Sequence, residues 1–229
     1  MRLLITGADR PLAQLLASRL GRLHSLRLAA CALPKRTEGA QWLDVDLREP
    51  DQVAPLVSDM DAILHLAEYD PGDLGETSGA KLEQERLDHA ARGTYVLLQQ
   101  ALKAKVERLI LASSLQVMAA YPTTYVIDET WRPRPLPTVE SLAPFLAEIV
   151  CRECAREAMI RIVCLRFGVL NDPDGTSEEH AVAAIEAALV LQFRRPGYYW
   201  HLFNVSASRC VLSRATEHTL GLGEHKRQA

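Results

Sequence analysis

The sequence predicts an α/β fold with a doubly wound, mostly parallel sheet. Short apolar runs alternate with longer helical patterns along the chain, and the second half repeats the strand and helix alternation of the first. The first apolar run also stops at Gly7, just before a predicted helix. Strands that are joined through helices are typical of a parallel sheet built from crossover connections. In such a sheet, ligands bind beyond the carboxyl ends of the strands.

Seven short apolar runs predict the strands, because they have the length and the residue types that strands favour. In chain order the expected strands are Arg2–Thr6, Ser25–Cys31, Trp42–Asp44, Ala62–Leu66, Arg108–Ser113, Ile160–Leu165 and His201–Val205.

Helical patterns fill the segments between these runs. In the first one, leucines recur on a single stripe and Gly21 follows as a stop signal. The expected helices are Pro11–Leu20, Gln52–Asp59, Ala80–Ala104, Ser141–Ala158 and Glu179–Phe193. Residues 122–144 contain five prolines, so we expect this segment to be irregular.

Composition narrows the class of protein. The chain has 229 residues, of which 48% are hydrophobic, and this length allows one large core. A net charge of -3 with scattered basic residues argues against electrostatic binding of nucleic acid. The first apolar run spans only three residues, too few for a signal peptide or a membrane span, and predicts a cytoplasmic protein without a membrane partner.

The five cysteines are an odd number without the spacing of a secreted domain, which favours reduced thiols. Cys151 and Cys154 form a CxxC inside a helical pattern, but no second pair follows. We interpret them as packing residues rather than as a redox or metal site. No metal site is expected from the histidines, since His180 and His201 lack companions at ligand spacing.

Separated segments of the chain resemble, in order, the landmarks of one superfamily. They are Leu3–Ala13 with its Thr-Gly turn, the acidic turn Asp44–Arg48, the Asp61–Ala67 strand, Gly93–Leu98, Arg108–Ser114 and Leu165–Gly168. The chain thereby resembles the short-chain dehydrogenase/reductase superfamily and, within it, the NAD-dependent epimerase/dehydratase group. Its layout is most similar to that of the uronate dehydrogenases.

The resemblance implies a single Rossmann-type domain over residues 1–229. Residues 1–158 would form the dinucleotide-binding core, and residues 159–229 a small, truncated substrate-side region. The long helices over residues 80–104 and 141–158 correspond to those through which members of this family dimerise, so we expect a homodimer. A purely structural role, such as pairing with an active paralogue, is a further hypothesis.

The resemblance also implies a cofactor site, whose residues would be Gly7, Arg10, Asp46, Leu47, Leu66 and Ala67. Gly7 supplies the tight turn that a dinucleotide fold needs. Arg10 stands where the group has its second glycine. A guanidinium there could clamp a phosphate, or the turn could be a helix start that no longer binds a dinucleotide.

The choice between NAD and NADP stays open. The second strand ends without a carboxylate for the ribose hydroxyls of NAD, and the next acid is Glu38. Lys35 and Arg36 lie in the same loop and would suit the 2′-phosphate of NADP. Binding of a sugar-like small molecule beside the dinucleotide is also expected from the resemblance.

The catalytic positions implied by the resemblance are mostly altered. Ser114 matches the serine that orients the substrate oxygen, but Ala90 stands where an asparagine is expected. Aligned on Glu148, the tyrosine and lysine positions hold Glu140 and Pro144, and a shift by two residues gives Leu142 and Leu146 instead. No register supplies both side chains, because residues 115–161 contain two tyrosines and no lysine.

These losses predict a pseudoenzyme that binds a nucleotide or another small molecule. Hydride transfer without its acid-base group would be slower by roughly 10²–10⁴. The alternative is an active NAD(P)-dependent sugar or sugar-acid oxidoreductase or epimerase with a non-standard acid-base residue, for which Glu140 is a candidate. Arg166, at a strand end, is expected to face the substrate pocket.

Overall fold

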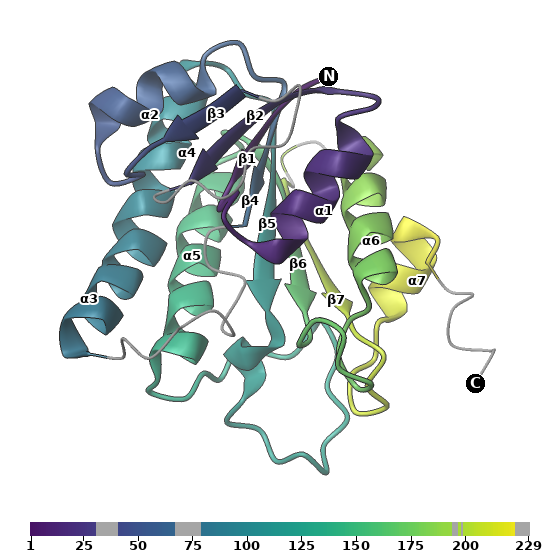
Figure 1. Ribbon diagram of the computed structural model, residues 1–229. Coiled ribbons are helices and arrows are strands. Elements are labelled where there is room, and N and C mark those ends of the chain that lie inside the picture. Colours follow the sequence, from purple (N-terminus) through teal and green to yellow (C-terminus); the bar gives the residue numbers. More distant parts are fainter. Residues whose placement is uncertain (31–40, 67–78, 194–196, 198, 223–229) are drawn as a thin grey trace.

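The computed structural model describes residues 1–30, 41–66, 79–193, 197 and 199–222. Within them, seven parallel strands form one sheet in the order β3-β2-β1-β4-β5-β6-β7 (Figure 1). The strands are β1 (Arg2–Thr6), β2 (Ser25–Ala30), β3 (Gln41–Asp44), β4 (Ala62–His65), β5 (Arg108–Ser114), β6 (Arg161–Phe167) and β7 (Trp200–Val205). This order, with the chain winding outward in both directions from β1 and β4, confirms the predicted doubly wound fold.

The helices follow the predicted plan with three differences. They are α1 (Pro11–Leu20), α2 (Pro50–Val57), α3 (Ala80–Asp88), α4 (Thr94–Lys103), α5 (Val139–Arg156), α6 (Glu178–Val190) and α7 (Arg214–Leu220). The expected single helix over residues 80–104 is divided by a π-helical turn at His89–Gly93. Helix α5 starts inside the segment that was expected to be irregular, and α7 was not expected.

Helices cover both faces of the sheet, as Figure 1 shows. On one face, α1 and α6 pack their apolar sides on the central strands; on the other, α2, α4 and α5 do so. Each inner strand therefore has two buried faces, and β4 is fully buried along its length. No helix in the described part of the chain is both long and apolar enough to cross a membrane.

Several segments of the chain meet at the carboxyl ends of the strands. The turn between β1 and α1 lies at this edge, and so do Ser114 at the end of β5 and the segment that follows β6. A short 3-10 turn, Leu115–Met118, continues directly from Ser114. The fold therefore brings the sequence-predicted cofactor and catalytic segments to one edge of the sheet.

Candidate functional site

A cavity of about 210 Å³ lies beside the turn that joins β1 to α1. Four segments line it: the turn itself, the end of β2, the segment after β3, and α3 with the π-helical turn. The lining residues are Gly7, Asp9, Arg10, Ala29, Ala30, Val45, Leu47, Leu82, Glu85, Arg86 and His89. Of the predicted cofactor residues, the cavity thus brings together Gly7, Arg10 and Leu47.

The segment between β1 and α1 forms a tight turn. Gly7 has a φ of 70°, in the left-handed region that favours glycine. The backbone N–H of Arg10 donates to the carbonyl oxygen of Gly7 at 3.0 Å, which closes the turn. Arg10 is the N-cap residue of α1 and Pro11 takes the first helical position, where a missing N–H costs little. The Arg10 side chain lies 3.7 Å from the Asp9 carboxylate, at the N-terminus of α1.

Asp46 is held by its neighbours next to this cavity. Arg48 donates to its carboxylate through both its backbone N–H and its guanidinium, and the His89 ring lies 3.6 Å away. Hydrogen bonds from the Arg48 side chain lower the pKa of Asp46 to about 2, so the group is ionised at neutral pH. The hydrogen bonds from Arg48 therefore use much of the acceptor capacity of the Asp46 carboxylate, so less of it would be available to an adenine.

Leu66 and His65 are buried and do not line the cavity. Leu66 is fully buried, and its backbone N–H donates to the Thr6 carbonyl oxygen. The His65 ring lies 2.7 Å from the Thr6 hydroxyl and 3.0 Å from the Thr94 hydroxyl. Burial lowers the pKa of His65 to about 4, so its ring is neutral at pH 7. His65 is thus a packed residue of the interior. Ala67, Lys35 and Arg36 lie outside the described residues.

One wall of the cavity was missed by the sequence analysis. Leu82, Glu85, Arg86 and His89 all face the cavity from α3 and the π-helical turn. Residues spaced three, four and seven positions apart lie on one helix face. A mostly polar stripe at this spacing is the sequence signal that could have identified this wall. The neighbouring Gly93 sits against Leu47, where an added Cβ would lie 3.4 Å from the Leu47 Cβ.

A second, larger cavity of about 730 Å³ opens at the ends of β5, β6 and β7. Ser114 lines it, and the Ser114 Oγ accepts a hydrogen bond from the Gln116 backbone N–H. Pro11 lines this cavity while the preceding Arg10 lines the first one, so the two cavities flank the start of α1. Ser114 thus lies on the wall of the second cavity, at the carboxyl end of β5.

The residues at the other predicted catalytic positions pack in the interior or form an ion pair between helices. Ala90, at the asparagine position, is fully buried and packs in an apolar cluster with Val139 and Ala143 of α5. Glu140 forms an ion pair with Arg86 at 3.6 Å, and Pro144 is buried inside α5. The region that would contain a tyrosine and lysine pair therefore holds an apolar cluster and an ion pair between helices.

The comparisons with known proteins agree with this geometry. The sequence model of the NAD dependent epimerase/dehydratase family matches residues 3–213. The chain belongs to this family. No curated protein matches it in sequence.

Solved structures of low sequence identity share the fold of this family member. Uronate dehydrogenase from Agrobacterium tumefaciens is 24% identical, with a TM-score of 0.77 over 96% of this chain and 83% of the other. Glucuronic acid dehydrogenase from Chromohalobacter salexigens is 21% identical, with the same TM-score and coverage. A short-chain dehydrogenase/reductase superfamily protein from A. tumefaciens with bound NAD is 16% identical, with a TM-score of 0.75 over 97% and 92%.

Arg166 of this family member does not face the substrate pocket, which corrects the expectation from the sequence. Alternation along β6 turns it toward α5, where its guanidinium donates to both carboxylate oxygens of Glu148 at 2.8 and 2.6 Å. The Ser113 hydroxyl also donates to Glu148, and Glu148 and Arg166 are both almost fully buried. A buried network therefore joins β5, α5 and β6 directly behind Ser114.

The CxxC motif has the environment of packing residues. Cys151 is fully buried, Cys154 is half-buried, and both are free thiols. Burial raises the pKa of both thiols, which disfavours the reactive thiolate. Within the described residues, no three His, Cys, Asp or Glu side chains are grouped so that they could hold a metal ion.

Proposed function

We propose that this chain is a pseudoenzyme of its family that binds a dinucleotide or a related nucleotide in the first cavity. The observation that carries the proposal is the packing of Ala90 against Val139 and Ala143. This apolar contact holds the asparagine position and the residues next to Glu140 and Pro144, which stand at the expected tyrosine and lysine positions. One domain would contain both parts, with residues 1–158 as the nucleotide-binding core and 159–229 as a reduced substrate-side portion.

The lost groups are the ones on which oxidation of a carbinol depends. A tyrosine exchanges the proton and a neighbouring lysine lowers the tyrosine pKa and holds the ribose. Positioned acid-base groups contribute roughly 10²–10⁴ to a rate, and neither side chain is present here. Glu140 is a poor substitute, because its carboxylate is engaged by Arg86 in an ion pair between α3 and α5.

The first cavity fits the adenosine diphosphate half of a dinucleotide. Val45 and Leu47 offer apolar walls for an adenine, and Arg10 stands at the N-terminus of α1, where a phosphate is favoured by the helix dipole. A bound nicotinamide would supply a hydride donor or acceptor. NAD and NADP are both candidates, and a structural neighbour contains NAD.

Calorimetric titration with NAD, NADH, NADP and NADPH tests this proposal, with an Arg10→Ala variant beside the native protein. We expect at least one dinucleotide to bind, and Arg10→Ala to weaken it by roughly 10- to 100-fold, because a hydrogen bond to a charged group contributes about 1.5–3 kcal/mol. Arg19→Ala is the matched control, since Arg19 is exposed in the last turn of the same helix. Its affinity should equal that of the native protein.

Two results would contradict the proposal. If none of the four dinucleotides binds, or raises the melting temperature, the first cavity is not a dinucleotide site. If the protein instead turns over a sugar or sugar acid with sustained change in nicotinamide absorbance, it is an active enzyme.

An active sugar or sugar-acid oxidoreductase is the second candidate function. The position of Ser114 favours it, because this hydroxyl still lines the large cavity at the end of β5. Structural neighbours are named for oxidation of uronates, so glucuronate and galacturonate are the first substrates to assay. A rate within about 100-fold of typical enzymes would require an acid-base group other than the lost pair.

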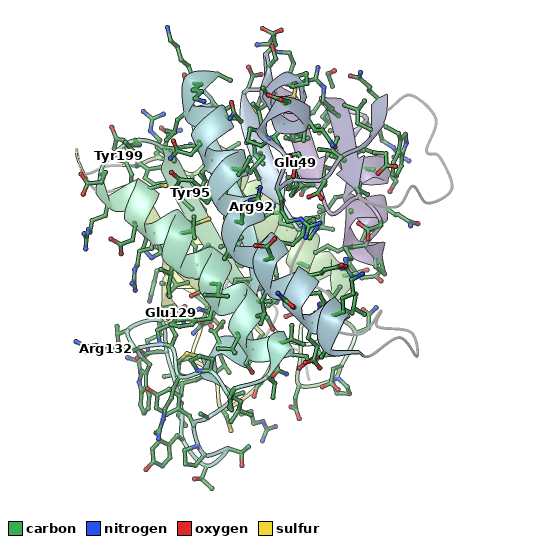
Figure 2. The ribbon with its side chains drawn as sticks, turned by 90° about the vertical axis from the view of Figure 1, so that its left-hand side faces the viewer. Glu49, Arg92, Tyr95, Glu129, Arg132 and Tyr199 are labelled. Carbon is green, nitrogen blue, oxygen red and sulfur yellow. The ribbon has the colours of Figure 1, made fainter. Side chains whose placement is uncertain are left out.

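We also propose a homodimer through the outer face of α4 and α5. The two helices lie side by side, and Figure 2 shows Tyr95 on their outer side. Tyr95 is 54% exposed, and Leu142 and Ile149 of α5 are half-buried. Partly exposed aromatic and aliphatic side chains on neighbouring helices are of the kind that a second copy of a chain can cover.

Light scattering after gel filtration tests the dimer. We expect a dimer for the native protein and a monomer for Tyr95→Glu, because the new carboxylate would be buried unpaired in the interface. Tyr125→Glu is the control, since Tyr125 is similarly exposed but lies outside α4 and α5. A native monomer, or a Tyr95→Glu variant that still dimerises, would rule out this interface.

A further inference from the structure

We infer that the second cavity takes a hydroxyl-rich ligand that carries no negative charge, such as a neutral or amino sugar. The inference names a ligand class for the substrate side and rests on the proposed function, in which the first cavity holds the nucleotide. It separates this chain from structural neighbours whose names refer to uronates.

The wall of the cavity carries carboxylates and no cation. Asp172, Asp174 and Glu178 line it, and among the described residues no lysine, arginine or histidine does. A carboxylate that entered this cavity would meet like charge instead of a guanidinium.

Helix N-termini do not supply the missing positive charge. Pro11 lines the cavity at the first position of α1 and has no N–H to donate. Glu178 lines it in the first turn of α6, so a carboxylate already offsets the positive end of that helix dipole. The Asn171 amide donates to the Glu178 carboxylate at 3.0 Å, which holds it at the cavity.

Two arginines whose side chains contact lining residues are engaged in other interactions. Arg166 directly precedes the lining residue Phe167, but its guanidinium is buried on the α5 side with Glu148. The Arg134 guanidinium stacks over the Tyr121 ring, 5.5 Å from its centroid, and Arg134 is not a lining residue. Neither guanidinium is therefore placed to bind an anionic ligand in the cavity.

The polar groups that remain are those that bind hydroxyls. The wall contains the hydroxyls of Ser114, Tyr121 and Ser208 and the amide of Gln116, between apolar patches such as Met118 and Val211. Such a mixture of few polar groups and apolar surface is typical of small-molecule sites. Hydroxyls and amides can both donate to and accept from a sugar, and the carboxylates can accept from a hydroxyl or an ammonium.

Three probes of one ring geometry test the inference: methyl glucoside, glucosamine and glucuronate. Their dissociation constants are measured by ligand-observed NMR, at low and at high salt, with and without a dinucleotide. We expect methyl glucoside and glucosamine to bind at least about tenfold more tightly than glucuronate at low salt. Because the carboxylates are exposed, salt should reduce the difference.

Variants in one loop show whether the cavity is the binding site. Thr123 lines the cavity and the adjacent Thr124 does not, and both are exposed. Thr123→Trp should abolish binding of the sugar by filling the space, whereas Thr124→Trp should leave it unchanged. Glu178→Gln should improve glucuronate binding, because it removes a like charge from the wall.

Glucuronate that binds as tightly as the other probes would overturn the inference. A failure of all three probes to bind, or binding that Thr123→Trp leaves unchanged, would also overturn it. The dinucleotide titration reports separately on the proposed function. Sugar discrimination without dinucleotide binding would remove the proposed function alone. Dinucleotide binding without discrimination would remove this inference alone.

Discussion

Replacement of Glu148 by leucine is expected to lower the free energy of unfolding by about 3–5 kcal/mol, measured by urea denaturation. Arg166 is 1% exposed, and its guanidinium donates to both oxygens of this carboxylate. Without Glu148 it would remain charged in an apolar layer between β6 and α5, with no water to solvate it. The Ser113 hydroxyl would lose its acceptor as well.

The double variant Glu148→Leu with Arg166→Met separates the loss of a partner from the value of the pair itself. It should recover most of the lost stability, because apolar residues of similar volume often replace a buried ion pair at little cost. Glu153→Leu on the same helix is the control. Glu153 pairs with Arg152 and Arg156 at the surface, where an ion pair contributes about 0–1 kcal/mol. Equal losses for Glu148→Leu and Glu153→Leu would show that the network does not stabilise the fold.

His65 is expected to make the protein less stable in mild acid. Its pKa is about 4 in the folded protein because the ring is buried, compared with an ordinary value near 6.5 in the unfolded chain. Between these values the unfolded chain binds the extra proton, so the free energy of unfolding falls as the pH falls from 6.5 to 4. The shift corresponds to a loss of about 3 kcal/mol across this window.

Denaturant unfolding at pH 7 and at pH 4.5 measures this effect. In His65→Gln the difference between the two pH values should be smaller than in the native protein, whatever the variant's own stability. His218→Gln should leave the difference unchanged, because His218 is exposed on α7 in the folded protein. His24, His89 and His201 also have lowered pKa values from burial, so part of the pH dependence should persist in His65→Gln. An unchanged difference in His65→Gln would contradict the assignment to this residue.

Local signals located the strands and most helices within a few residues. The stripe of leucines and the stop at Gly21 predicted α1 with its observed ends, and the apolar run before Gly7 predicted β1. Longer patterns were less informative. The π-helical turn at His89–Gly93 keeps a helical periodicity on either side, so the sequence does not reveal it. Pro144 disfavours a helix by itself, but it is tolerated in α5 because the surrounding residues are packed against the sheet.

The candidate site shows the same division. Gly7, Arg10 and Leu47 were recognisable from a motif, and the absence of a tyrosine and lysine pair was readable directly from residues 115–161. The stripe of α3 residues on the cavity wall was missed, because its meaning depends on which surface that helix covers. The assignment of the first cavity as a cofactor site stays a prediction until a dinucleotide is titrated.

The sequence by itself determined the order of the strands and most helices along the chain, the family, and the absence of a tyrosine and lysine pair from residues 115–161. These follow from periodicity and from residues that are close along the chain. Only the tertiary structure decided that Arg166 turns to Glu148, that Glu140 pairs with Arg86, and that Ala90 packs on α5. Each of these contacts joins segments far apart in sequence. Its partner is fixed by strand alternation and helix packing, which no local pattern contains.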